Sequence, residues 1–461
     1  MRSLLHSRRG SVAFATVIAL VPLIGVVALG GEAGSWYVTR QHAQNAADAA
    51  AYSGAMQQLC LLNAPCAVTQ TVDYRAKQSA AQNAFCNSGG TSYPGSQCSS
   101  SLPAGVSQTV TIASLTSWNG NPGTFVQATV SQQQPAYLAQ VLGLSTVTIP
   151  ATAVATVQSL TAPPCVLSLT GSISFQGSPN INAPNCGMAS NDPAKDAINF
   201  TGGGMSMNLG SLSTVGGCTG AASFCNTALT YMPAPTTNPF SALDGALTTL
   251  CGANPTLPAK CGLPVCPGSD LVAYVAGSAS TACTNNNVST KGNANVPLAA
   301  GVSVYFISGI LTLKGNSIVS CTNPCTGVTF ILLPGATIDM KGGAMLTLNG
   351  PATAPGASSL PAALQSSAAL FQYMSMYVAP ATPAPPMTFG GNSNINLTGN
   401  IYAPKAAVTF QGNPTIAVGG AGGCGQLVAA SIAFNGNATF DTTGCPSQTK
   451  VPKNQYVQLV Q

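Results

Sequence analysis

The chain has 461 residues, of which only 5% are charged and 46% are hydrophobic, and its net charge is +5. This composition is too apolar for a disordered chain, and the absence of a dense Lys/Arg cluster beyond the N-terminus argues against nucleic-acid binding. Because His6 and His42 are the only histidines and Glu32 is the only glutamate, the chain beyond residue 43 cannot form a Ser-His-Asp, Cys-His or His-containing zinc site.

The first predicted element is a transmembrane helix over residues 11–31, an uncharged apolar run that follows Arg8 and Arg9. As a helix this run extends roughly 31 Å, which is about one hydrocarbon core. The basic residues before it predict a cytoplasmic tail at residues 1–10, with the bulk of the chain periplasmic or extracellular. A cleaved signal peptide, with small residues at Ala28-Leu29-Gly30, is the alternative, although the apolar run exceeds the usual length.

An Ala- and Gln-rich stretch from Arg40 to Tyr52 follows, and no proline occurs before Pro65. Ala and Gln are strong helix formers. We therefore expect one helix to continue from the membrane segment to about Leu59.

Several of these residues form a recognisable series: Arg9-Gly10-Ser11, the apolar span, Glu32, Arg40, and Gln44-Asn45-Ala46-Ala47-Asp48-Ala49-Ala50-Ala51. The series resembles the N-terminal segment of TadG-like proteins of the bacterial tight-adherence (Tad/Flp) pilus system. The resemblance implies a single-pass inner-membrane protein, pilus-assembly partners and a pilin-like head. Its motif positions are Arg9, Gly10, Glu32, Arg40, Gln44, Ala46, Ala47, Asp48, Ala49 and Ala50.

The chain also departs from that pattern. Glu32 stands where the family typically has Asp, and Ala15 occupies the place of the glutamate of a processed prepilin, so prepilin processing is not expected. The metal-binding motif of the von Willebrand A domain that many TadG-like proteins carry is missing. Glu32 is predicted either to reach the membrane interface or to contact a pilin or assembly component.

Residues 32–162 are predicted to form a pilin-like helix and small sheet. Apolar alternation indicates strands at 106–115, 125–130 and 145–157, and residues 136–142 could form a short helix. We expect three or four antiparallel strands packed on the distal part of the long helix.

A repeat of the form apolar-x-apolar-x-Gly, followed by a further apolar position, begins after about Pro163. Its copies are 173–181, 311–319, 387–395, 408–416 and 432–440, with weaker copies at 198–206 and 338–346. A loose period of about 20–30 residues with Gly corners fits the coils of a parallel β-helix. Residues 163–461 are therefore predicted to be a β-solenoid domain in a mainly β protein, with a β-sandwich as the alternative.

Two irregular segments interrupt the repeat, at about 233–291 and at 351–386, and the final residues 450–461 are expected to cap the solenoid. The 16 cysteines contain no Cys-x-x-Cys pair, and their export predicts disulfides rather than a metal site. Close pairs are Cys60/Cys66, Cys218/Cys225, Cys261/Cys266 and Cys321/Cys325, and residues 233–291 are predicted to be an insertion held by disulfides.

The sequence favours a non-enzymatic structural or adhesive component of a pilus or surface apparatus, with no cofactor and possible contacts to surface glycans. The alternative is a secreted β-helix protein that binds or degrades polysaccharide. Such enzymes need clustered carboxylates, or Lys or Arg with Asp on one face, often with calcium. Here no Glu occurs after Glu32 and no Arg occurs after Arg75. Asp339 and Lys341 share one face of a predicted coil, where a single pair is expected to be solvated.

Overall fold

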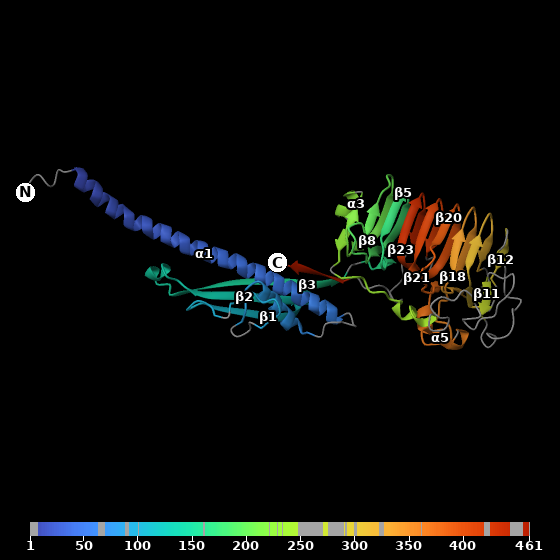
Figure 1. Ribbon diagram of the computed structural model, residues 1–461, viewed down its shortest axis with the longest axis horizontal. Coiled ribbons are helices and arrows are strands. Elements are labelled where there is room, and N and C mark those ends of the chain that lie inside the picture. The colour runs from blue at the N-terminus through green and yellow to red at the C-terminus, as the bar shows by residue number, and fades with distance from the viewer. Residues whose placement is uncertain are drawn as a thin grey trace, which may run out of the picture. The chain divides into compact units, whose positions relative to one another are not determined.

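The computed structural model forms two compact units: an N-terminal unit, residues 1–158 with 455–461, and a solenoid unit, residues 159–454. Figure 1 shows both. The structure describes residues 8–62, 70–87, 92–99, 101–159, 162–220, 222–227, 229–232, 234–247, 271–274, 290, 293–298, 302–321, 327–360, 362–418, 425–442 and 455–460.

A single long helix, α1 (Arg8–Leu62), opens the N-terminal unit. The expectation that one helix continues through the apolar run to about Leu59 is confirmed, with an end three residues later. By length and composition α1 could cross a membrane. Apolar side chains in its first half, among them Leu23 and Val26, are exposed, as expected of a surface that lipid would cover.

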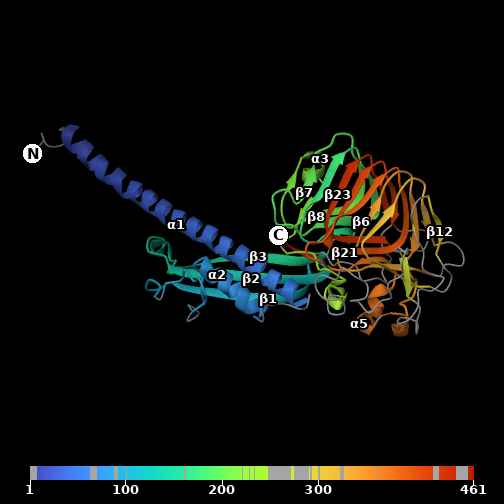
Figure 2. The same cartoon turned by 45° about the vertical axis from the view of Figure 1, so that its right-hand side comes forward.

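The sheet of the N-terminal unit contains β1 (Ser107–Trp118), β2 (Asn121–Pro135), β3 (Thr146–Ser159) and β25 (Gln455–Val460), in that order. β2 pairs antiparallel with β1 and with β3. The predicted strands and their packing against the distal helix are confirmed, since α1 lies along β2 and β25. Figure 2 shows α1 running over this sheet.

Two elements of this unit differ from expectation. A second helix, α2 (Val72–Gln82), packs on α1, and Thr71 caps it by accepting a hydrogen bond from the Tyr74 amide. The prediction that residues 450–461 cap the solenoid is wrong for 455–460, because β25 adds to the sheet beside β3. The solenoid unit therefore does not run to residue 461.

The solenoid unit is a parallel β-helix in which short strands stack into rungs. Its strands are β4 (Pro164–Ser168), β5 (Ile173–Gly177), β6 (Asn180–Ser190), β7 (Ile198–Phe200), β8 (Ser206–Thr214), β9 (Cys218–Thr219), β10 (Leu229–Tyr231), β11 (Leu271–Tyr274), β12 (Asn295–Pro297), β13 (Val304–Ile307), β14 (Ile310–Leu313), β15 (Ile318–Ser320), β16 (Thr329–Leu332), β17 (Thr337–Met340), β18 (Met345–Asn349), β19 (Met374–Val378), β20 (Met387–Gly391), β21 (Asn394–Gly412), β22 (Thr415–Val418), β23 (Gly425–Gly436) and β24 (Thr439–Thr442). Most neighbouring rungs pair in parallel, and β11 pairs antiparallel with β13.

The predicted repeat copies stack in register. The third residue of the repeat forms a column along the solenoid, in which Phe389, Phe410, Phe434, Phe175 and Phe200 stack with ring centroids 4.9–5.4 Å apart. The glycine of the repeat forms a second column, and in every copy except 198–206 it adopts a positive φ. A Cβ on Gly412 would lie 3.0 Å from the Gly391 carbonyl oxygen, so glycine is needed both for the turn and for the close approach of the rungs.

The order of the rungs in space differs from their order in the chain. The first rung of the sequence, β4 to β6, pairs with β23 and β24, which come last in the solenoid. After β6 the chain adds β8, β9 and β10 on one side of this first rung. The strands from β12 onward form further rungs, which approach the first rung from its other side and end beside it at β23. Neighbouring rungs in the middle of the solenoid therefore come from segments some 260 residues apart in the chain.

The outer face of one solenoid sheet carries a second apolar core that includes Tyr377, Tyr402 and Val428. Short helical turns pack on it: η3 (Ser241–Leu243), α5 (Ala362–Gln365) and η6 (Ala368–Phe371). The turn η5 (Ala357–Ser359) precedes α5 and buries none of its residues. Part of the second predicted insertion therefore covers the solenoid. A further helix, α3 (Ala222–Thr227), places Phe224 against Phe200.

The described disulfides join Cys86 to Cys98, Cys165 to Cys186, and Cys218 to Cys225. The last of these joins two cysteines that lie close together in the sequence. Cys60 and Cys321 are also disulfide-bonded. Their close neighbours in the sequence, Cys66 and Cys325, lie outside the described residues, as do Cys251, Cys261, Cys266 and Cys283 of the predicted disulfide-held insertion.

Candidate functional site

The Ala-rich motif of α1 forms a stripe of small side chains that faces the rest of the N-terminal unit. Its buried members recur at helical spacing and have no exposed surface: Ala43, Ala46, Ala47, Ala50, Ala51 and Ala55. They pack in one core with alanines of α2 and with Val126, Ala128 and Val130 of β2. The predicted motif positions Ala46, Ala47 and Ala50 are therefore packing positions, while Ala49 is half-buried.

Gly54 extends this stripe and marks the tightest approach of α1 to its neighbours. A Cβ at this position would lie 2.8 Å from Val126 Cγ1 and 3.2 Å from Ala76 Cβ. A larger side chain would therefore push the helix away from both the sheet and α2. The small-residue stripe sets how closely the helix can lie on the sheet.

The polar motif positions lie beside the stripe. The Gln44 side-chain amide donates to Asp48 Oδ1 at 2.8 Å, one helical turn away, and to the Thr152 carbonyl of β3 at 3.4 Å. Gln44 therefore links the helix to the sheet. Arg40 is exposed on α1, and Arg9 and Gly10 lie in the first turns of the same helix.

Glu32 is the motif residue with the most extensive hydrogen bonding. Its carboxylate accepts backbone N–H groups from Tyr137 at 2.7 Å, Leu138 at 3.1 Å and Ala139 at 2.8 Å. These consecutive amides begin the short helix η2 (Ala139–Leu142), where backbone donors have no partner within the helix. A carboxylate satisfies such donors well, because the bonds are charge-assisted.

This contact adds a role that the sequence did not suggest. The prediction for Glu32 was an interfacial position or an intermolecular partner, whereas the structure places a loop of the same chain, more than 100 residues away, on the carboxylate. The predicted short helix at 136–142 is present as η2, but its dependence on Glu32 left no local signal in the sequence.

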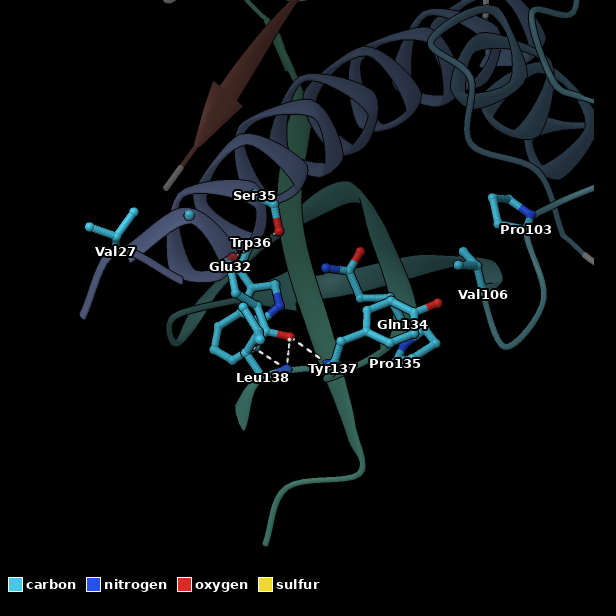
Figure 3. Close-up of a pocket in the computed structure, with 11 residues that line it drawn as sticks. Val27, Glu32, Ser35, Trp36, Pro103, Val106, Gln134, Pro135, Tyr137 and Leu138 are labelled. Atoms are coloured by element: carbon cyan, nitrogen blue, oxygen red, sulfur yellow. Dashed lines mark hydrogen bonds between the residues drawn. The ribbon is translucent and has the colours of Figure 1, made fainter. Parts of the chain in front are cut away.

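A pocket of about 460 Å³ lies beside this contact, and Figure 3 draws the side chains around it. One wall is α1, from Val27 to Trp36, and the other includes Pro103, Pro135 and Leu138. The Trp36 indole nitrogen is buried and has no hydrogen-bond partner among the residues that the structure describes. The pocket thus has a mainly apolar lining, in which Glu32, Ser35 and Gln134 are the polar members, together with an N–H donor that no described residue satisfies.

The solenoid unit contains a buried polar cluster around Tyr402. Its hydroxyl donates to Asp244 and accepts from the Asn238 side-chain amide at 2.8 Å, while the Tyr377 hydroxyl donates to the Leu243 carbonyl at 2.6 Å. Burial raises the pKa of Asp244, opposed by the hydrogen bond from Tyr402 and by the charge of Lys405. Burial also raises the pKa values of Tyr377 and Tyr402. These contacts fasten the 234–247 segment to the solenoid.

Other charged groups of the solenoid are scattered. Asp339 and Lys341 form an ion pair at 2.8 Å, in which the lysine side chain is 58% exposed, as expected for a solvated pair. Among the residues that the structure describes, no group of three or more His, Cys, Asp or Glu side chains could hold a metal ion.

Comparison with known proteins places one part of the chain. No curated protein and no solved structure matches the chain. A family model described as putative Flp pilus-assembly TadE/G-like matches residues 10–57. This range covers the apolar half of α1, Glu32 and all of the small-residue stripe. Residues 10–57, which form most of α1, are therefore similar to the TadE/G-like segment of Flp pilus-assembly proteins.

Proposed function

We propose that this protein is a non-enzymatic, membrane-anchored structural or adhesive component of a Tad/Flp-type pilus or a related bacterial surface apparatus. The TadE/G-like match at residues 10–57 is the observation that carries the proposal. The apolar half of α1 serves as an inner-membrane anchor with a cytoplasmic N-terminus. The sheet and the solenoid then lie in the periplasm or outside the cell.

The solenoid supports a structural role through its construction. Its interior is filled by stacked apolar side chains, and its exterior carries few charges because only 5% of the chain is charged. The chain beyond residue 43 has neither His nor Glu to supply an acid, base or nucleophile partner. The Ser-, Thr- and Asn-bearing outer faces could contact pilus proteins or surface glycans.

Anchorage and orientation can be tested in spheroplasts of cells that produce the full chain with a C-terminal epitope tag. Membrane fractionation is expected to recover the protein with the inner membrane, and added protease is expected to remove the tag. An alkaline phosphatase fusion after Gln461 should be active, and a β-galactosidase fusion should not. A soluble species that begins near Gly31 would refute the anchor, and a protected tag would refute the orientation.

The pilus role requires a separate test. Deletion of the gene should change piliation or surface attachment, and the full chain should restore the wild-type phenotype. A chain in which residues 8–31 are replaced by an unrelated transmembrane helix tests whether α1 only anchors the protein. If deletion leaves both piliation and attachment unchanged, the proposed role is wrong.

A further inference from the structure

The pocket between α1 and the Pro135–Leu138 segment has the chemistry of a lipid site. We propose that it binds one phospholipid at the bilayer interface, with an acyl chain along Val27 and an ester carbonyl on the Trp36 indole N–H. This inference rests on the proposed membrane anchorage of α1. It assigns the pocket a ligand class and a depth in the bilayer.

The position of the pocket along α1 is the first argument. If the hydrocarbon layer ends near residue 31, Val27 lies in its last turn, and Trp36 lies about 7 Å beyond it. The interfacial layer of a bilayer is about 5–8 Å thick on each side. The pocket wall from Val27 to Trp36 is about 13 Å long, so it passes from the acyl-chain region into the ester region.

The second argument is the unsatisfied donor in the wall. The Trp36 indole nitrogen is buried, and no described residue accepts a hydrogen bond from it, although a buried indole N–H usually finds a partner. Because the neighbouring Glu32 carboxylate is negatively charged, an anionic acceptor is disfavoured near it. An ester carbonyl is a neutral acceptor that a phospholipid supplies at this depth.

The third argument is the rim of the pocket. The Glu32 hydrogen bonds hold Tyr137 and Leu138 at the depth of residue 32. Tyr137 is 73% exposed and Leu138 is 42% exposed. Between Lys77 and Asp192 the sequence has no charged residue, so nothing on this loop opposes contact with lipid. An exposed Tyr is favoured at the bilayer interface, and an exposed Leu is favoured at the adjoining edge of the hydrocarbon layer.

The test uses the full chain in vesicles of phosphatidylethanolamine and phosphatidylglycerol, doped with a phosphatidylcholine whose acyl chain carries a diazirine. After illumination, lipid adducts are mapped by peptide mass spectrometry. Gly31→Phe is designed to fill the pocket, because Gly31 lines it and a Cβ there meets nothing within 4 Å. Gly34→Phe is the matched control, since Gly34 has the same free space and is not among the lining residues.

We expect adducts on residues 134–138 in the wild-type chain and in Gly34→Phe, and their loss in Gly31→Phe. Trp36→Phe should lower this labelling about two- to tenfold, since one hydrogen bond is lost. Equal labelling of 134–138 in both glycine variants would overturn the proposal. Unlabelled 134–138 in the wild-type chain would do the same.

Adducts on residues 16–26 report contact with bulk lipid. They therefore distinguish a failure of the proposed lipid site from a failure of the proposed membrane anchor. If these adducts persist in every variant while 134–138 stays unlabelled, the lipid site fails and the anchor stands. If residues 16–26 are also unlabelled in the wild-type chain, the membrane anchor itself is refuted, and the lipid site falls with it.

Discussion

The contact between Glu32 and the amides of residues 137–139 yields a sharp prediction. Glu32→Ala removes the acceptor of hydrogen bonds of 2.7–3.1 Å. A hydrogen bond to a charged group is worth about 1.5–3 kcal/mol, but water can replace the carboxylate at the exposed Tyr137 and Leu138 amides. We therefore expect a local loss of about 1–2 kcal/mol, which corresponds to a roughly 5- to 30-fold larger population of the open loop and a matching increase in its hydrogen exchange.

Hydrogen exchange of the peptide covering residues 134–139, measured on the full chain in lipid nanodiscs, is the appropriate assay. Glu32→Gln should give an intermediate effect, because one side-chain oxygen remains. Ser35→Ala is the matched control, since Ser35 lines the same pocket and its hydroxyl bonds only to the carbonyl of Glu32 within α1. Exchange in Glu32→Ala that equals the Ser35→Ala rate would refute the capping role.

Further predictions concern packing and titration, each checked by unfolding of the full chain. Gly54→Leu should destabilise the N-terminal unit by about 1–3 kcal/mol, because a Cβ there already lies 2.8 Å from the sheet, while Gly34→Leu, in open space, should not. Phe434→Ala should cost the solenoid about 3–5 kcal/mol, since this ring joins the last rung to the first, and the half-buried Phe224→Ala should cost clearly less. Asp244 has a folded-state pKa above its ordinary value of 3.8, so its contribution to stability is present below that pH and is lost as the pH rises through the folded pKa. Asp244→Asn should abolish this loss, and an unchanged pH profile would contradict the assignment.

The sequence allowed the rungs of the solenoid to be identified because each copy of the repeat has the same local requirement. An apolar residue at the first and third positions must face the core, and Gly must adopt positive φ at the corner. The column of Phe389, Phe410 and Phe434 confirms this reasoning position by position. The helix α2 was missed, although Thr71 and the Ala-rich residues after it offered a start signal and a high helix propensity.

The amino-acid sequence alone determined the membrane-length helix, the TadE/G-like motif and the parallel rungs, because each depends on periodicity or composition within a short window. Only the tertiary structure decided that Glu32 holds the 137–139 amides, that β5 pairs with β23, and that β25 joins the sheet of the N-terminal unit. Each of these contacts joins segments more than 100 residues apart. Local sequence preference does not specify such pairings, since they depend on which surfaces meet when the whole chain has folded.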